Sequence, residues 1–417
     1  MTEKQVDVLV VGGGPAGLAA GIAAREAGCE NVLVADREDA PGGILKQCIH
    51  NGFGLHAFKE ELTGPEYAQR YIDLAHAAGV AIQCGAMVVD LTKDRRATVV
   101  SREHGLELIR AKAVVLAMGC RERPRGALAT PGTRCAGIYT AGNAQKLVNR
   151  MGLMPGRRVV ILGSGDIGLI MARRMTFMGA KVLACVEIMP YSVGLTRNIV
   201  QCLDDFDIPL HLSHTVVDIE GKERLTGVTI ARVDENLSPI PGTEQKLACD
   251  TLLLSVGLLP ENELSAMAGV PLAASTGGAE VDEAMQTQIP GIFSCGNVLH
   301  VHDLVDFVSE EAARAGKSAA AFAKGGLKPR GTVPVRAGYG VLGLVPQFIS
   351  NEPNAPVKLM FRPKEVYKGA RIVVEREGRE IYSRRERILV PGEMVMISLS
   401  PEKLGTGSAP IEARVEV

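Results

Sequence analysis

Two glycine-rich segments of the same design constrain what this chain folds into. The first follows the apolar run VDVLVV and the second follows RRVVIL, and each leads into a helix of mostly small or apolar residues. Their glycines stand in G-x-G-x-x-G spacing, at Gly12, Gly14 and Gly17 and again at Gly163, Gly165 and Gly168. Such glycines allow a tight turn, the approach of a pyrophosphate and close helix–strand packing. Each segment therefore predicts a strand–turn–helix unit that binds a dinucleotide.

An acidic residue follows each glycine motif, at the end of the next apolar strand. These residues are Asp36 and Glu187, and each stands at the same spacing from the last glycine of its motif, Gly17 or Gly168. A carboxylate at this place accepts hydrogen bonds from ribose hydroxyls, and it repels a 2′-phosphate. Glu187 therefore favours NAD over NADP at the second site, although Arg197, ten positions later, leaves NADP open.

Composition limits the remaining choices. The 417 residues are enough for about two to four domains, and the many small and aliphatic residues, 47 glycines among them, suggest α/β architecture. The net charge of −1 gives no electrostatic case for nucleic acid. Glycines and a proline interrupt the apolar N-terminal run, so it predicts no membrane span. The nine cysteines include no C-x-x-C pair and read as reduced thiols of a cytoplasmic protein.

Two further strands complete a pattern on either side of the second glycine motif. Residues 111–120 and 249–262 are apolar runs that contain Gly119 and Gly257, and TQIPGIFSCGNV then precedes a helix over residues 302–322. From about residue 5 to 325 the chain resembles flavoproteins with two dinucleotide-binding domains, like the pyridine nucleotide–disulfide oxidoreductases. The resemblance implies an FAD domain (1–120 and 256–328) with an inserted NAD domain (121–255). Beyond it, residues 329–417 predict a small antiparallel β-sandwich.

The resemblance also implies which residues hold the cofactors. In the family a late Gly-Asp motif holds the flavin ribityl chain, and here it is Gly296-Asn297. The helix start at about Asp306 to Val308 would direct N–H groups to the flavin. The implied FAD residues are Gly12, Gly14, Pro15, Ala16, Gly17, Asp36, Arg37, Gly43, Val88, Gly119, Gly296, Asn297, Phe307 and Val308. The implied NAD residues are Gly163, Gly165, Asp166, Ile167, Gly168, Glu187 and Gly257.

Several stretches point to a role in electron transfer. GGILKQCIHNGFG, GCRERPRGAL and GNVLHVHDLVDFVSEE look like the oxidoreductases that accompany anaerobic glycerol-3-phosphate dehydrogenase-like flavoproteins. TAGNAQ also resembles the α subunits of dye-linked amino-acid and opine dehydrogenases. Both resemblances imply FAD- and NAD(H)-dependent electron transfer beside a second dehydrogenase or flavoprotein subunit, in a homo- or hetero-oligomer. A non-catalytic nucleotide-binding subunit is the other role open to such a chain.

Cys48 and His50 raise the alternative of thiol chemistry. Neither dithiol of the disulfide reductases is present, because Cys48 and Cys135 each stand alone in the regions concerned. A single-thiol peroxide or disulfide reductase remains open, since His50 lies where it could lower the pKa of Cys48. The competing interpretation, which we favour, is that Cys48 packs beside the flavin.

The remaining candidates are histidines. His302 or Asp303 could relay protons near the flavin, and a histidine held by backbone contacts explains the same pattern. We expect no metal site from Cys295, His300 and His302, because their spacing matches no established ligand set. His211 and His214 are expected on opposite faces of a strand.

Overall fold

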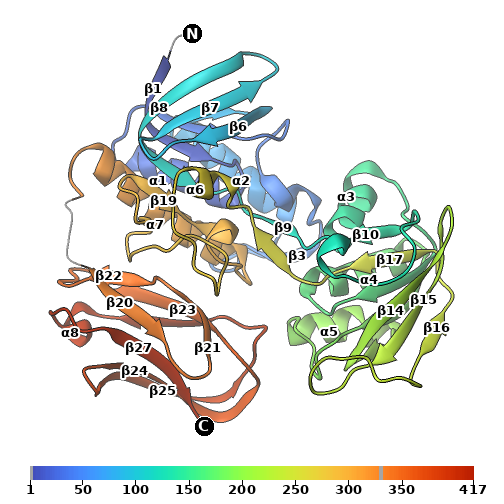
Figure 1. Ribbon diagram of the computed structural model, residues 1–417. Coiled ribbons are helices and arrows are strands. Elements are labelled where there is room, and N and C mark those ends of the chain that lie inside the picture. The colour runs from blue at the N-terminus through green and yellow to red at the C-terminus, as the bar shows by residue number, and fades with distance from the viewer. Residues whose placement is uncertain (1–2, 328–331) are drawn as a thin grey trace. The chain divides into compact units, whose positions relative to one another are not determined.

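A computed structural model gives the structure of this protein and describes residues 3–327 and 332–417 (Figure 1). The chain forms two compact units, one of residues 1–120 and 260–417 and the other of Arg121–Leu259. The expected domain limits at 120/121 and 255/256 stay predictions, and the expected start of the C-terminal domain at residue 329 lies outside the described residues.

The first unit contains a largely parallel sheet. β1 pairs in parallel with β2 and β8, and β8 also pairs in parallel with β19. The strand order is β5-β2-β1-β8-β7-β6, with β19 beside β8. The central strands are apolar on both faces because helices and loops cover both sides. The bounds are β1 (Glu3–Val11), β2 (Val32–Ala35), β5 (Ala81–Gln83), β6 (Ala86–Leu91), β7 (Arg96–Ser101), β8 (Gly105–Leu116) and β19 (Ile292–Ser294).

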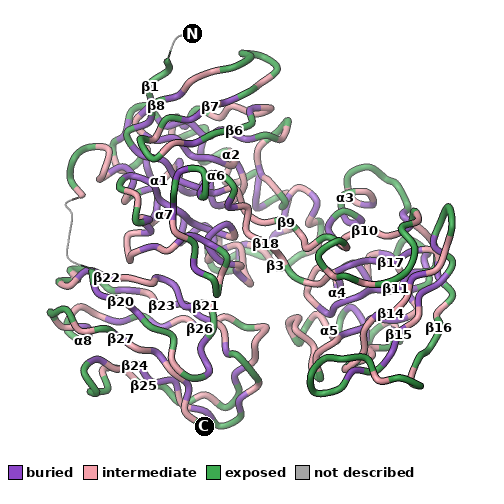
Figure 2. The backbone as a smooth tube through the Cα atoms, in the orientation of Figure 1, coloured by how far each residue is buried: buried purple, intermediate pink, exposed green. Residues whose placement is uncertain are grey.

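Two helices that are far apart in the sequence pack together beside this sheet. They are α1 (Pro15–Glu26) and α7 (Val305–Ala323), whose backbones approach so closely that a Cβ on Gly316 would lie 2.1 Å from the Ala20 carbonyl oxygen. Figure 2 shows the buried residues gathered along these elements. The shorter elements are η1 (Gly43–Gln47), β3 (Asn51–Phe53), β4 (Leu62–Thr63), α2 (Gly64–Ala77), α6 (Glu263–Met267) and η4 (Gly296–Val298).

The second unit has a parallel sheet of its own, in the order β10-β17-β11-β12-β13. An antiparallel sheet, β14-β15-β16, accompanies it. The predicted apolar run 111–120 contains the second half of β8, and the run 249–262 contains β17. Each of the two parallel sheets therefore includes one of these strands. The bounds are β10 (Ile138–Thr140), α3 (Ala141–Met151), β11 (Arg158–Leu162), α4 (Asp166–Phe177), β12 (Lys181–Val186), α5 (Thr196–Cys202), β13 (Leu210–His211), β14 (His214–Gly221), β15 (Leu225–Arg232), β16 (Gln245–Leu247) and β17 (Thr251–Leu254). At the unit boundaries and in loops lie β9 (Cys120–Glu122), η2 (Arg125–Ala127), η3 (Asp204–Phe206) and β18 (Leu258–Pro260).

Residues 332–417 form two sheets around an apolar core that includes Phe361. Five strands follow the order β22-β20-β27-β24-β25 and three follow β21-β23-β26. The prediction of a purely antiparallel sandwich is wrong for one pair, because β20 and β27 are parallel. The connection between these two strands comprises the rest of the segment, and it is long enough for a parallel crossover. The bounds are β20 (Thr332–Ala337), β21 (Val341–Val345), β22 (Phe348–Ser350), β23 (Val357–Pro363), β24 (Tyr367–Arg376), β25 (Arg379–Leu389), β26 (Val395–Leu399), α8 (Pro401–Leu404) and β27 (Ile411–Glu416).

A carboxyl in the loop before β19 makes stability depend on pH. Burial raises the pKa of Asp282 to about 6, although its Oδ1 accepts N–H bonds from Ala284 and Gln286. The folded state then binds more protons than the unfolded state between about pH 4 and 6, so stability falls as pH rises through that window. We expect Asp282→Asn to be more stable than the wild type by about 1–2 kcal/mol at pH 7.5. Urea unfolding should show no such gain at pH 4, and an equal gain at both pH values would contradict the assignment.

Candidate nucleotide-binding sites

The first glycine loop leaves open space at the start of α1. A Cβ on Gly12 would lie 2.4 Å from the Ala117 carbonyl oxygen, and one on Gly17 would lie 1.7 Å from that of Gly12, so packing requires both glycines. A Cβ on Gly14 would meet only the Gly43 Cα, at 3.8 Å. No side chain caps the first N–H groups of α1. This combination fits a pyrophosphate at the helix N-terminus.

Three segments far apart in the sequence meet at this point. Gly43 packs against the loop, because an added Cβ would lie 2.9 Å from the Gly14 Cα. Gly296 has a φ of +71° and packs against α1, since its added Cβ would lie 2.9 Å from the Ala16 Cβ and 3.3 Å from the Val308 side chain. The fold thus places the glycine loop, η1 and the Gly296-Asn297 turn around one helix start.

Asp36 lies beside the same loop and is 5% exposed. Its Oδ2 accepts the Gly13 N–H at 2.6 Å, and its Oδ1 accepts the Glu38 N–H at 2.8 Å. These bonds fix the carboxylate at the end of β2, where a ribose would lie in a dinucleotide site of this architecture.

The second unit repeats this arrangement. Glu187 is 4% exposed, and its Oε2 accepts bonds from Ser164 N–H at 2.8 Å and Ser164 O–H at 2.7 Å. Its Oε1 accepts the Met189 N–H at 3.0 Å. In both units the acid lies 23 residues after its partner in the loop and also binds the N–H group two residues further on. The two glycine loops therefore share their hydrogen-bond pattern as well as their sequence spacing.

Ser255 shapes the second glycine loop, and no pattern in the sequence announced it. A Cβ on Gly163 would lie 2.1 Å from the Ser255 carbonyl oxygen, and one on Gly168 would lie 2.7 Å from the Ser255 Cβ. The Ser255 hydroxyl also accepts the Gly168 N–H at 3.1 Å. Gly165 is the N-cap residue of α4 and offers no side chain to cap the helix, which begins with Asp166 and Ile167; the Ser255 hydroxyl bonds the third N–H group of that first turn, that of Gly168.

Asp166 and Gly257 complete the surroundings of this loop. The Asp166 Oδ1 accepts bonds from the Leu195 N–H at 2.8 Å and the Asn198 amide at 2.7 Å, and so ties α4 to the start of α5. Arg197, the residue that leaves NADP open, is exposed in α5. Gly257 has a φ of +102°, and its added Cβ would lie 4.0 Å from the Arg123 Nε.

The other residues implied for FAD lie in varied surroundings. Arg37 is exposed, whereas Val88 is buried in β6 opposite Val99. An added Cβ on Gly119 would meet no atom within 4 Å. The Asn297 Oδ1 accepts the His302 N–H at 3.1 Å. The roles of these residues toward FAD stay predictions.

The start of α7 differs from the expectation in detail. The helix begins at Val305, three residues after the start of the predicted helix 302–322 and one residue before Asp306, where its N–H groups were expected to begin. The Asp306 carboxylate accepts the Ala57 N–H at 2.8 Å and the Gly54 N–H at 3.2 Å. Phe307 lies with its ring 5.0 Å from that of His56. The Asp306 carboxylate in the first turn of α7 therefore fixes the loop formed by residues 54–57.

Cys48 packs against the start of α2. Its carbonyl oxygen accepts the Gly64 N–H at 2.9 Å, and a Cβ on Gly64 would lie 2.8 Å from the Cys48 Cβ. Burial raises the pKa of the Cys48 thiol to about 12, so it is protonated at neutral pH. His50 lies with its Nδ1 3.0 Å from the Asn51 carbonyl oxygen. The nine cysteines of the chain all lie in the described ranges and are thiols rather than disulfides.

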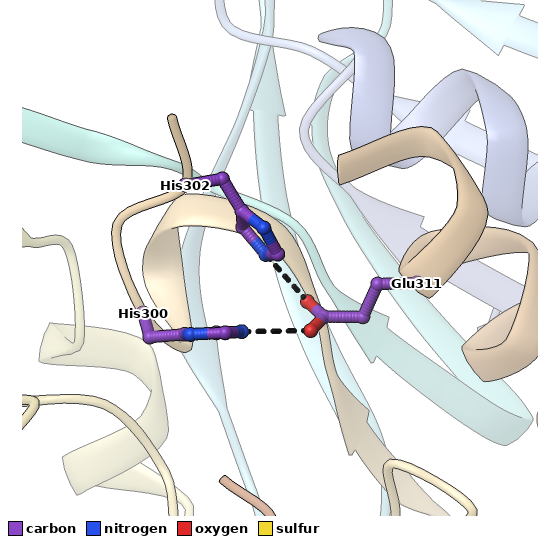
Figure 3. A group of neighbouring side chains, drawn as sticks. All are labelled: His300, His302 and Glu311. Atoms are coloured by element: carbon purple, nitrogen blue, oxygen red, sulfur yellow. Dashed lines mark hydrogen bonds and ion pairs between the residues drawn. The ribbon is translucent and has the colours of Figure 1, made fainter. Parts of the chain in front are cut away.

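Two pairs of histidines remain. His300 and His302 meet Glu311 in a buried cluster (Figure 3). The rings of His211 and His214 lie 5.4 Å apart, so their expected placement on opposite faces is wrong. Ser213, with a φ of +53°, turns the chain between them, and the continuous strand assumed from the sequence does not form.

Among the residues that the structure describes, no helix combines the length and the apolar character needed to cross a bilayer.

Comparison with known proteins places these features in context. A family described as "Pyridine nucleotide-disulphide oxidoreductase" matches residues 6–319. The hydrogen cyanide synthase subunit HcnB of Pseudomonas protegens is 24% identical over 313 residues, which cover 70% of this chain and 65% of the relative. An opine oxidase subunit of Agrobacterium tumefaciens is 26% identical over 284 residues, which cover 64% of this chain and 55% of the relative. The chain thus spans a little over half to about two thirds of these relatives.

A solved structure shares the fold. The thioredoxin reductase of T. acidophilum superimposes with a TM-score of 0.62 at 23% sequence identity, and the match covers 76% of this chain and 98% of that one. The likeness shows an α/β fold with Rossmann-like sheets.

Proposed function

The chain belongs to the pyridine nucleotide-disulphide oxidoreductase family, and from that premise we propose that it is an FAD-dependent NADH:acceptor oxidoreductase. Membership makes it a flavoprotein oxidoreductase that uses FAD and NAD(P)H. Our proposal concerns the route of the electrons, which pass between NAD(H) and a partner dehydrogenase subunit or a small acceptor.

The repeated loop geometry is the observation that supports this proposal most directly. Each unit has a glycine loop, a glycine as the N-cap of the following helix and a buried carboxylate bound to the loop. One site of this kind would suit a single cofactor, whereas two suit a protein that transfers a hydride between two dinucleotides. A disulfide substrate is disfavoured because the sequence lacks the dithiol that disulfide reductases of this family use.

The chain's own residues bind and orient the cofactors. We assign the Gly14 opening and the α1 N-terminus to the FAD pyrophosphate, Asp36 to its ribose and Asn297 to its ribityl chain. Gly165, the α4 N-terminus and Glu187 have the corresponding tasks for NAD(H). Bound FAD supplies the hydride and electron chemistry, and the protein supplies orientation and fixed dipoles.

The named relatives support a partner subunit. Two of them carry names that describe parts of larger assemblies, one of a synthase and the other of an oxidase. Residues 327–417 contain 15 basic and 10 acidic residues, a balance of 15 − 10 = +5. We propose that this basic segment faces the partner.

Anaerobic reduction tests the proposal. NADH should bleach the flavin absorbance of the purified protein, and an artificial dye should then give many turnovers. NADPH should act less well, because Glu187 repels its 2′-phosphate. An unbleached flavin would refute the proposal, and reduction without turnover would favour a non-catalytic subunit.

Cys48→Ser separates this function from thiol chemistry. Because the half-buried Cys48 thiol is protonated, we expect the variant to reduce dye with NADH within about twofold of the wild-type rate. A single-thiol peroxide or disulfide reductase would lose its turnover. Steady-state rates with dye and with hydrogen peroxide distinguish the two, and a loss of the dye rate at unchanged flavin content would contradict our expectation.

A further inference from the structure

We propose that His300, His302 and Glu311 form a binding site for a divalent metal ion, with Zn²⁺ as the best fit. Two imidazoles and one carboxylate are a ligand set that zinc uses in proteins. The three side chains offer ligand atoms that all lie within 4.8 Å of one another. The proposal is independent of the proposed oxidoreductase function.

The cluster is assembled by two neighbouring segments. His300 and His302 alternate on the chain between η4 and α7, and Glu311 projects from the second turn of α7 toward both (Figure 3). The His300 Nε2 lies 2.8 Å from the Glu311 Oε2, and the His302 Nε2 lies 3.2 Å from Oε1. Ligands of a tetrahedral zinc ion stand about 3.3 Å apart, given bonds of about 2.0–2.1 Å. Shifts of about 0.5 Å or less would therefore open these two contacts to an ion.

Burial separates this cluster from a chance group on the surface. The side chains of His300, His302 and Glu311 are 4%, 1% and 2% exposed. A carboxylate that is ionised at such depth requires strong compensation. Besides the two imidazoles, the Gly296 N–H donates to the Glu311 Oε1 at 2.7 Å. A bound cation would offset the remaining negative charge.

One atom of the cluster has no partner. The His302 Nδ1 is buried and makes no hydrogen bond with the residues that the structure describes. Ligation through Nε2 would place the ring proton on Nδ1, where it would need an acceptor such as a water molecule. The unpartnered nitrogen shows that the residues the structure describes leave His302 incompletely satisfied.

A bound ion would tie three parts of the first unit together. Glu311 links it to α7, the histidines to the loop before that helix, and the Gly296 N–H to the turn that packs on α1. Three protein ligands would leave the fourth position to a water molecule.

Zinc binding by the full-length protein tests the site. The protein is treated with a chelator and dialysed, and Zn²⁺ is then titrated by calorimetry, with Co²⁺ as a spectroscopic probe of tetrahedral ligation. We expect one tight equivalent in the wild type. Glu311→Gln and His302→Gln should weaken it by at least about 100-fold, since changes outside the ligand shell alone weaken sites by about 10–100-fold.

The half-buried pair His211 and His214 provides the control, because its rings lie together but belong to no cluster of three ligand groups within the described ranges. His211→Gln should leave the tight equivalent unchanged. His302→Gln keeps the Gly296–Glu311 bond, so it remains informative if Glu311→Gln fails to fold. A wild-type protein that binds no Zn²⁺, or a His302→Gln variant that binds it as tightly as the wild type, would overturn the proposal.

Discussion

Gly14→Ala is expected to fold without FAD, whereas Gly17→Ala is expected to be strongly destabilised, although the two glycines share one motif. The methyl added at Gly14 would meet only the Gly43 Cα, at 3.8 Å, and the Gly14 φ of −75° suits any residue. It would occupy the opening assigned to the pyrophosphate. We expect FAD affinity to fall by at least about 100-fold, equivalent to about 2.7 kcal/mol.

Gly17→Ala acts on the fold itself. Its methyl would lie 1.7 Å from the Gly12 carbonyl oxygen, which is backbone and cannot move without displacing α1 from β1. We expect a loss of about 3 kcal/mol or more in the free energy of unfolding. Urea unfolding and flavin released by heat measure the two effects separately. Equal flavin content in Gly14→Ala and the wild type would show that the opening is not the cofactor site.

Glu187→Gln is expected to raise the KM for NADH about tenfold, equivalent to about 1.4 kcal/mol, at unchanged flavin content. The amide keeps the shape of the side chain but loses the charge that accepts ribose hydrogen bonds and repels a 2′-phosphate. The preference for NADH over NADPH, measured as the ratio of kcat/KM values, should fall by a similar factor.

Asp36→Asn is the matched control, because Asp36 has the equivalent bonds in the first unit. It should lower flavin content and leave the KM for NADH of the flavin-loaded fraction unchanged. If Glu187→Gln reduced flavin content instead, the assignment of the two sites would be reversed.

The glycine motifs and their acids were predictable because local chemistry determines them. A tight strand-to-helix turn needs glycine, and a carboxylate at the end of the next strand reaches back to the loop. The sequence therefore predicted a strand–turn–helix unit at both motifs. The meeting of Gly43 and Gly296 at the first motif was implied only by resemblance.

Features that depend on long-range packing were not predictable. Glu311 looks like an ordinary helix residue, and only the packing of α7 brings it to His300 and His302. His211 and His214 meet because Ser213 adopts a left-handed conformation that its sequence does not announce. The parallel pairing of β20 with β27 joins the first and last strands of a segment, and alternation of apolar residues contains no information about such partners.

The insertion of the second unit has a consequence for synthesis on the ribosome. β8 ends at Leu116, but its parallel neighbour β19 begins only at Ile292, after the whole second unit. At a synthesis rate of about 5–20 residues per second, the start of β19 is synthesised roughly 9–35 s after the end of β8. The interval between α1 and α7 is longer. The continuous second unit leaves the ribosome complete in the meantime. Its folding therefore precedes completion of the first sheet, and nascent chains stalled soon after the second unit has emerged should contain a protease-resistant middle and a sensitive beginning.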